Sequence, residues 1–264
     1  MSDTLFKIKI AGTVVEISSL YDCIHEFCLD YVTDEDPVFT VNITQDDIDF
    51  EREYEEKGPE GNGRIPEDYP DSYLEVLACY RKIAEEMITR DILLMHGSAV
   101  SIDGCGVMFI AGSGTGKSTH AGIWQRCFRE RAVLVNDDKP LVKITDDEIF
   151  VCGTPWSGKK GLNTPVNVPL KCIYKLERTS DVIRDDGSPE VSIGNNKVYG
   201  ISGDEMWKAL ASQSYKSADP LKLSYSMGLL DKIMQKIPVK RLVCDMTDDA
   251  AFAAYEGVFG GGIS

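Results

Sequence analysis

A glycine-rich run that ends in a lysine and two hydroxyl residues is the segment of this sequence best suited to chemistry. Glycines let the backbone curl so that several N–H groups face one phosphate, and a helix that begins after them adds the positive end of its dipole. The pattern is that of a phosphate-binding loop with alanine in the first glycine position. It predicts ATP binding, with Lys117 on the β- and γ-phosphates and Ser118 on magnesium. The run reads Ala111-Gly112-Ser113-Gly114-Thr115-Gly116-Lys117-Ser118-Thr119.

Two adjacent carboxylates form the second motif, at the end of the apolar run Leu134-Val135-Asn136-Asp137-Asp138. A hydrophobic strand that leads into acids, one helix and one strand beyond a phosphate loop, is typical of phosphoryl-transfer sites. One acid can hold magnesium, and the other can accept the proton of an incoming hydroxyl. The pattern alone leaves open which of the two acids has which role.

Short apolar runs and helical periods around these motifs predict the elements that position them. The run GVMFIA at 106–111 is typical of a buried strand, and 117–128 has the spacing of a packed helix. Further strands are expected at 98–102, 132–135, 141–145, 149–152, 170–176 and 239–244, and helices at 204–215, 223–237 and 248–258. This pattern predicts an α/β fold over residues 91–264, in which helices flank a mixed sheet that carries the phosphate loop.

Residues 1–90 have a different pattern, which predicts a small separate β-rich domain of unknown role. The alternating, β-branched segment 5–19 predicts a hairpin that turns at Ala11-Gly12, and 39–44 predicts another strand. Glycines and prolines at 58–70 predict a loop, and the apolar spacing of 72–90 predicts an amphipathic helix.

Composition narrows the range of functions. The 264-residue chain carries 43 acidic and 28 basic residues, a net charge of −15 that repels a nucleic-acid backbone. The sequence has no run of about 18 apolar residues and no signal-peptide pattern at its start. We therefore expect a cytoplasmic protein without membrane or nucleic-acid partners. The eight cysteines lack zinc-site spacing and are expected to be reduced thiols.

The central part of the chain resembles HPr kinase/phosphorylase over about residues 93–145. The phosphate loop of ATP-dependent phosphoenolpyruvate carboxykinase, a member of the wider group, is similar to Ser113–Lys117. The matching segments are Met95–Val100 (MHGSAV), Gly104–Val107 (GCGV), AGSGTGKST and LVNDD. The resemblance implies that His96 is an active-site histidine near the transferred phosphate and that Asp138 activates the acceptor hydroxyl. Asp137 is then the expected metal ligand beside Ser118, and because the two acids are adjacent, the exchanged assignment stays open. The resemblance also suggests a homo-oligomer.

Two features differ from the HPr-specific enzymes. Thr119 stands where those enzymes carry glutamate, and Gly153–Asn163 (GTPWSGKKGLN) occupies the approximate place of their arginine-containing signature. This cationic segment can close over phosphate or an acidic acceptor, or it can be a surface turn with solvated lysines. Trp156 can line an acceptor pocket or pack in the core. The acceptor and the reverse phosphorylase reaction are therefore open.

The sequence thus predicts an ATP- and magnesium-dependent kinase. Its acceptor would be a hydroxyl of a small molecule, or of a serine in a small protein or peptide. One alternative is a non-catalytic ATP-binding sensor, although such a protein would not need an intact lysine, serine and acid pair. A carboxykinase-type lyase would need a further metal site with histidine and lysine ligands and a longer chain, and this sequence has three histidines.

Overall fold

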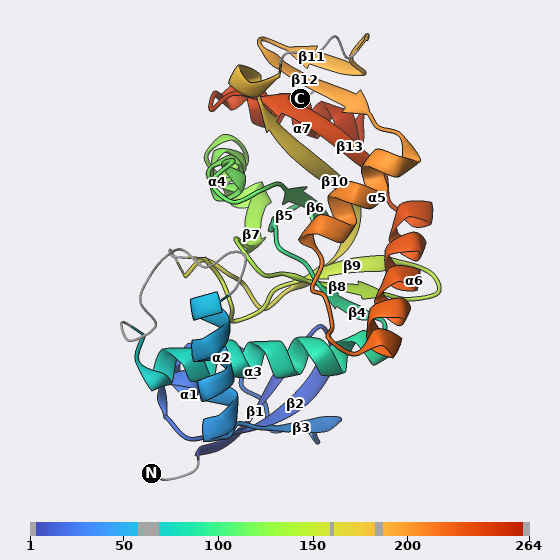
Figure 1. Ribbon diagram of the computed structural model, residues 1–264. Helices are drawn as coiled ribbons and strands as arrows, with labels where there is room; N and C mark the ends of the chain where they lie inside the picture. The colour runs from blue at the N-terminus through green and yellow to red at the C-terminus, as the bar shows by residue number, and fades with distance from the viewer. Residues whose placement is uncertain (1–3, 58–68, 159–160, 183–186, 261–264) are drawn as a thin grey trace. The chain divides into compact units, whose positions relative to one another are not determined.

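The computed structural model describes residues 4–57, 69–158, 161–182 and 187–260 (Figure 1). Most of the predicted 58–70 loop lies outside these residues, as do Lys159 and Lys160 of the predicted cationic segment. The chain divides into two compact units, Met1–Met87 and Ile88–Ser264.

The N-terminal unit is built around a three-stranded sheet. Strands β1 (Thr4–Ile10) and β2 (Thr13–Ser19) pair antiparallel, and β3 (Phe39–Asn42) pairs parallel to β2. Ala11 and Gly12 both have positive φ angles, 49° and 73°, as the tight turn of a two-residue hairpin requires. The predicted hairpin and the strand after it are confirmed.

Helices complete this unit, and two of them, α1 and α2, were not predicted. Helix α1 (Cys23–Phe27) is short, α3 (Asp71–Met87) falls on the predicted amphipathic segment, and α2 (Gln45–Lys57) forms from a strongly acidic stretch. Two of the α2 acids form ion pairs with α3, where Arg81 bonds Glu51 and the Lys82 Nζ lies 2.7 Å from an Asp47 carboxylate oxygen. Strands therefore account for only part of the unit.

The second unit contains a mixed, curled ten-stranded sheet among its described residues. Its main path runs β11-β12-β13-β10-β6-β5-β7, while β9, β8 and β4 continue from the other half of β10 (Figure 1). The predicted α/β class with a mixed sheet is confirmed. The strands are β4 (Ile92–Leu94), β5 (Ser98–Ile102), β6 (Cys105–Ile110), β7 (Ala132–Asn136), β8 (Leu141–Ile144), β9 (Ile149–Cys152), β10 (Asn167–Arg178), β11 (Val191–Ile193), β12 (Asn196–Gly200) and β13 (Val239–Cys244).

Helices cover both faces of this sheet, because β6 sends alternate side chains to opposite sides. Val107 and Phe109 pack with α4 (Lys117–Phe128) and α7 (Asp248–Phe259). Met108 and Ile110 pack with α5 (Gly203–Gln213) and α6 (Pro220–Lys236). Single 3₁₀ turns occur at Leu29–Tyr31, Ile88–Arg90, Arg129–Arg131 and Thr179–Asp181.

Three neighbouring strands of the sheet run in the same direction, so their carboxyl ends lie along one edge. β6 and β13 both pair parallel to β10, so the three strands end side by side. β6 leads into residues 111–116, β10 ends at Arg178, and β13 ends at Cys244. In α/β sheets, ligands bind in the crevice outside the carboxyl ends of such strands.

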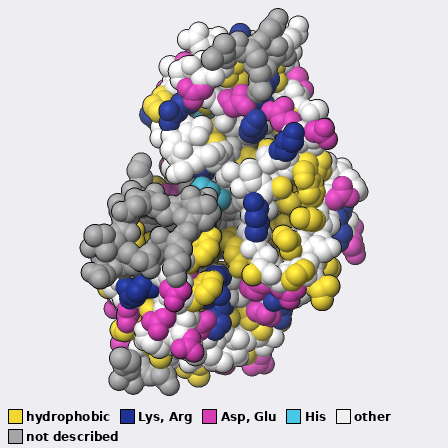
Figure 2. Space-filling view, viewed as in Figure 1, with side chains coloured by type: hydrophobic (Ala, Val, Ile, Leu, Met, Phe, Trp, Pro, Cys, Tyr) yellow, Lys and Arg dark blue, Asp and Glu magenta, His cyan; other side chains and the backbone are white. Residues whose placement is uncertain are grey.

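Two surface properties bear on partners. Among the described residues, no helix has the length and apolar character needed to cross a membrane. On the face shown in Figure 2, acidic and basic side chains are interspersed, and apolar side chains gather over α6, where Leu221, Tyr225 and Met227 are exposed.

Candidate active site

The predicted phosphate loop joins β6 to α4, and we call residues 111–116 the glycine loop. Gly114 and Gly116 have φ angles of 73° and 113°, in the left-handed region that favours glycine. Gly116 is also the residue that precedes the first turn of α4. The N–H groups of a first helical turn have no partners within the helix, so they are available to an anion at this position.

Lys117 lies along the glycine loop. Its side chain is only 7% exposed, and its Nζ donates hydrogen bonds to the Ala111 carbonyl at 2.9 Å and the Gly112 carbonyl at 3.3 Å. The ammonium group is therefore held against the start of the loop by neutral carbonyl oxygens. Negatively charged oxygens form stronger hydrogen bonds with an ammonium than neutral carbonyls do, so an anion in the loop can replace them.

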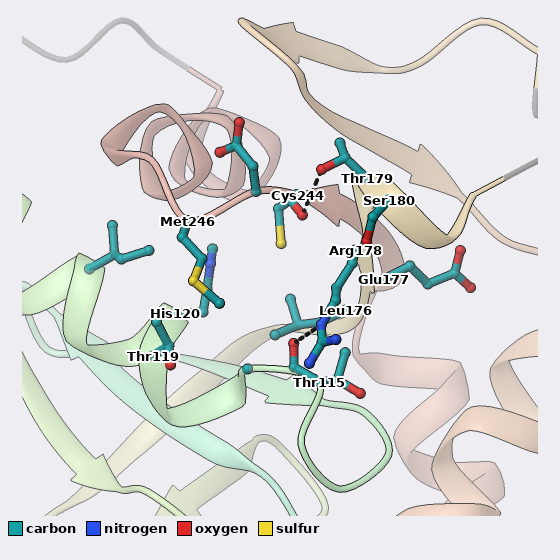
Figure 3. A pocket seen from close by; sticks show the side chains of 13 residues that line it. Thr115, Thr119, His120, Leu176, Glu177, Arg178, Thr179, Ser180, Cys244 and Met246 are labelled. Atoms are coloured by element: carbon teal, nitrogen blue, oxygen red, sulfur yellow. Dashed lines mark hydrogen bonds between the residues drawn. The ribbon is translucent and has the colours of Figure 1, made fainter.

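Arg178, which sequence reasoning missed, holds the glycine loop from the end of β10. Its Nη2 donates to the Gly114 carbonyl. Its Nε donates to the Thr115 carbonyl at 3.3 Å, as Figure 3 shows. The C=O and N–H of a trans peptide point in opposite directions. Arg178 therefore turns the N–H groups of Thr115 and Gly116 away from itself, and the Thr115 N–H points across the loop toward the Gly112 carbonyl, 3.4 Å away.

Asn136 fixes the turn that carries the acid pair. It is fully buried, and its Nδ2 donates to the Thr154 and Trp156 carbonyls at 3.0 and 3.1 Å. Its Oδ1 accepts from the backbone N–H groups of Asp138 and Lys139 at 2.9 and 2.7 Å. The Asn136 side-chain amide therefore connects the turn that carries the acid pair, which we call the acid turn, to residues 154–156.

Asp137 connects the acid pair to the start of α4. Its backbone carbonyl accepts hydrogen bonds from the hydroxyls of Ser98 and Ser118, at 2.8 and 3.2 Å. Its carboxylate, in a residue 3% exposed, accepts from the Gly158 N–H at 2.5 Å. A side chain at Gly158 would begin 3.0 Å from the other carboxylate oxygen. The Asp137 carboxylate is thus covered by residues at the end of the described 153–158 segment.

The 153–158 segment lies against the acid turn, and Trp156 within it is buried. The two lysines on which the alternative roles of this segment depend lie outside the described residues. Closure over phosphate and a solvated turn both stay predictions.

Asp138 points to a different set of partners. Its Oδ1 lies 3.2 Å from His96 Nε2, and its Oδ2 lies 3.5 Å from Lys139 Nζ. Burial raises the pKa of Asp138, but the His96 hydrogen bond and the Lys139 charge outweigh burial and bring the pKa below its ordinary value. The group is therefore a carboxylate at neutral pH. The backbone N–H of His96 donates a hydrogen bond to the Gln213 carbonyl at 2.7 Å, which fixes the position of this residue.

The predicted metal ligands offer oxygen atoms of the kind that magnesium prefers. The Ser118 hydroxyl lies beside Asp137, and magnesium in phosphate sites is commonly held by one or two protein ligands together with phosphate oxygens and water. Within the described ranges, no group of three or more His, Cys, Asp or Glu side chains is arranged to hold a metal ion. The donor set therefore fits magnesium that arrives with a phosphate ligand.

A pocket of about 210 Å³ lies at the edge where the parallel strands end (Figure 3). It is lined by the start of α4, by the end of β10 and by the residues that follow β13, among them Thr119, His120, Arg178 and Met246. His120, also missed by sequence reasoning, is 3% exposed, and burial lowers its pKa to about 3. The imidazole is therefore neutral. Its Nε2 accepts a hydrogen bond from the Trp124 indole at 3.2 Å.

No protein-family model and no curated protein matches this chain. Among solved structures, the HPr(Ser) kinase/phosphatase from Coxiella burnetii is similar to it, with 13% sequence identity and a TM-score of 0.30. The match covers 54% of this chain and 90% of that chain. At this TM-score the likeness is distant.

Proposed function

We propose that this protein is a magnesium-dependent kinase that transfers the γ-phosphoryl group of ATP to a hydroxyl. The acceptor is a small molecule, or a serine in a small protein or peptide. The observation that carries the proposal is the 3.2 Å hydrogen bond from the Ser118 hydroxyl to the Asp137 carbonyl. It joins the first turn of α4, directly after the glycine loop, to the acid pair, and Asp138 in turn contacts His96. The glycine loop, the two acids and the histidine therefore lie close enough to act together in the proposed reaction.

The glycine loop supports phosphate binding through fixed donors. The N–H groups at the start of α4 and that of Gly116, which Arg178 orients through the Thr115 carbonyl, require no large rearrangement to meet a phosphate oxygen. Lys117 exchanges the carbonyls of Ala111 and Gly112 for phosphate oxygens, because a negatively charged oxygen forms a stronger hydrogen bond with an ammonium group than a neutral carbonyl does.

Ser118 and Asp137 are the residues that would hold magnesium. The hydroxyl oxygen of Ser118 and the carboxylate of Asp137 are hard donors, and the two residues are in contact because that hydroxyl bonds the Asp137 backbone carbonyl. Magnesium, when bound, neutralises phosphate charge as it develops during transfer. The Gly158 N–H, 2.5 Å from one Asp137 oxygen, keeps that carboxylate in a fixed orientation.

Asp138 is the base in this proposal. Its carboxylate accepts the proton of the acceptor hydroxyl while the hydroxyl oxygen bonds to the γ-phosphorus, and the bond from that phosphorus to the bridging oxygen of ADP breaks. His96 orients the carboxylate through its contact with Oδ1. Because the pKa of Asp138 is lowered, the proton-accepting form is present throughout the neutral range. Incubation with labelled ATP and a panel of hydroxyl acceptors tests the transfer directly.

Magnesium-ATP is expected to stabilise the chain against heat. A ligand that binds only the folded state adds about 2.7 kcal/mol to the free energy of unfolding when its concentration is about 100-fold above its Kd. Differential scanning fluorimetry measures the effect, with magnesium alone and ATP with a chelator as controls. An unchanged melting temperature in millimolar magnesium and ATP would contradict any role for ATP.

Arg178→Ala is expected to weaken magnesium-ATP binding on the order of tenfold, because the loop loses two hydrogen bonds from a charged donor that orient its N–H groups. Titration calorimetry on the purified variant measures the change. Arg131→Ala is the matched control, since that arginine pairs with Asp103 on the surface. Parent-like affinity in Arg178→Ala would show that the loop keeps its shape without this contact.

A further inference from the structure

The pocket beside the glycine loop lies where a nucleotide would continue beyond its phosphates. Thr115, Gly116 and Thr119 line both the loop region and the pocket, so a chain of phosphates on the loop leads into it. Its volume of about 210 Å³ is below the roughly 300–1,000 Å³ of sites that enclose a whole drug-sized ligand. The space therefore suits one part of a ligand whose remainder lies outside.

The walls of the pocket favour a flat, largely apolar group. Ile123 of α4 and Leu176 of β10 contribute branched apolar side chains, and Met246 contributes an unbranched thioether. The Met246 side chain is 65% exposed, so it can change rotamer at the pocket wall without disturbing the core. Methionine sulfur makes favourable contacts with aromatic rings.

His120 supplies a donor that has no partner among the described residues. The indole N–H of Trp124 is a donor only, so the His120 Nε2 that receives it must be unprotonated. In a neutral imidazole the proton is then on Nδ1, and this buried atom makes no hydrogen bond. Buried polar groups are nearly always satisfied. Figure 3 shows the His120 ring and the Met246 thioether on the same side of the pocket.

We propose that this pocket binds the adenine base of the nucleotide, and that His120 Nδ1–H donates a hydrogen bond to one of its ring nitrogens. This proposal rests on the proposed function, because the phosphates must lie on the glycine loop for the base to reach the pocket. Adenine suits the site because N1, N3 and N7 are all acceptors and its ring faces can pack on Met246 and Ile123. His120 is thus a specificity-determining residue.

The first test compares ligands on the parent protein with titration calorimetry in magnesium. Inorganic tripolyphosphate reports on the glycine loop alone, ATP reports on loop and pocket, and 1-deaza-, 3-deaza- and 7-deaza-ATP each lack one ring acceptor. We expect ATP to bind more tightly than tripolyphosphate. One deaza analogue should bind roughly tenfold more weakly than ATP, as one lost hydrogen bond predicts, and the other two should bind as ATP does.

The second test uses variants at the pocket. In His120→Phe, the deaza analogue that binds the parent protein more weakly should bind as ATP does, because the variant has no donor for the missing ring nitrogen. The four affinities form a double-mutant cycle that isolates the contact between His120 and that nitrogen. His120→Gln, which can still donate, should restore part of the discrimination. Met246→Ala should weaken ATP but leave tripolyphosphate unchanged, and Met227→Ala on the exposed face of α6 is the matched control.

The outcomes separate this proposal from the function on which it rests. If ATP and tripolyphosphate bind equally and all three analogues match ATP, the adenine assignment is overturned while the glycine loop keeps its role. If no phosphate ligand binds at all, the proposed kinase function is overturned as well. Should His120→Phe not fold, the analogue series on the parent protein decides the question by itself.

Discussion

Lys117→Ala is expected to abolish nucleotide-dependent phosphoryl transfer while the chain stays folded. Lys117 is the first residue of α4, its Nζ bonds the Ala111 and Gly112 carbonyls of the glycine loop, and these bonds can be exchanged for phosphate contacts. Removal of one such preorganised donor from a transfer site typically costs about 10²–10³ in rate, or about 3–4 kcal/mol of transition-state stabilisation. Labelled-ATP turnover measures the loss.

The matched control for this variant is Lys171→Ala. Lys171 is exposed, lies in the same unit, and has a long 3.8 Å ion pair with Glu148, so its loss should leave both rate and stability unchanged. Circular dichroism and melting temperature establish that Lys117→Ala is folded. Near-parent turnover in the folded variant would refute the phosphate-loop assignment, and with it the proposed function.

Elements with a strong local pattern were predicted well. Helix α4 and strand β13 have the bounds that apolar spacing indicates, because their contacts with the sheet follow the period of the sequence. Helix α2 was missed for the opposite reason. Its thirteen residues are mostly polar and acidic, and it is stabilised in part by ion pairs from α3, such as that between Arg81 and Glu51. Such a helix has no apolar period in its local sequence from which it could be predicted.

The same distinction applies to the candidate site. The glycine loop and the acid pair each consist of consecutive residues, so both motifs can be recognised from the sequence alone. Arg178 reaches the glycine loop because β10 pairs with β6, and this pairing cannot be predicted from the sequence. The available signal was a basic residue at the end of a strand, but the strand predicted from the sequence ends at residue 176, before Arg178.

The environments of Asp137 and Asp138 could not be predicted for a related reason. The two acids are equivalent in sequence, and what separates them comes from distant segments. Gly158 approaches one carboxylate, and His96 contacts the other. The structure therefore gives the two carboxylates different partners, which is the condition for different roles, while the roles themselves stay a prediction that mutation must decide.

Asp138→Asn is expected to separate catalysis from binding. The amide keeps the shape of the side chain and still accepts the His96 hydrogen bond, but it cannot take a proton from an acceptor hydroxyl. General-base assistance is worth about 10²–10⁴ in rate, so transfer should fall by that factor while the Kd for ATP stays near the parent value. Asp231→Asn on α6, where the acid bonds Gln235 on the surface, is the matched control.

Asp137→Asn should behave differently, because a metal ligand acts on binding before it acts on chemistry. Loss of its charge beside Ser118 should raise the magnesium concentration needed for activity and weaken magnesium-dependent ATP binding together. Titration of both variants with magnesium at fixed ATP distinguishes the two roles. If the magnesium requirement shifts in Asp138→Asn and the rate alone falls in Asp137→Asn, the assignments are exchanged and the kinase proposal stands.

If both variants bind ATP and transfer phosphate at the parent rate, the acid pair has no part in the reaction and the mechanism proposed here is wrong. A protein that binds ATP with its acid pair intact but transfers phosphate to no acceptor would instead be a nucleotide sensor.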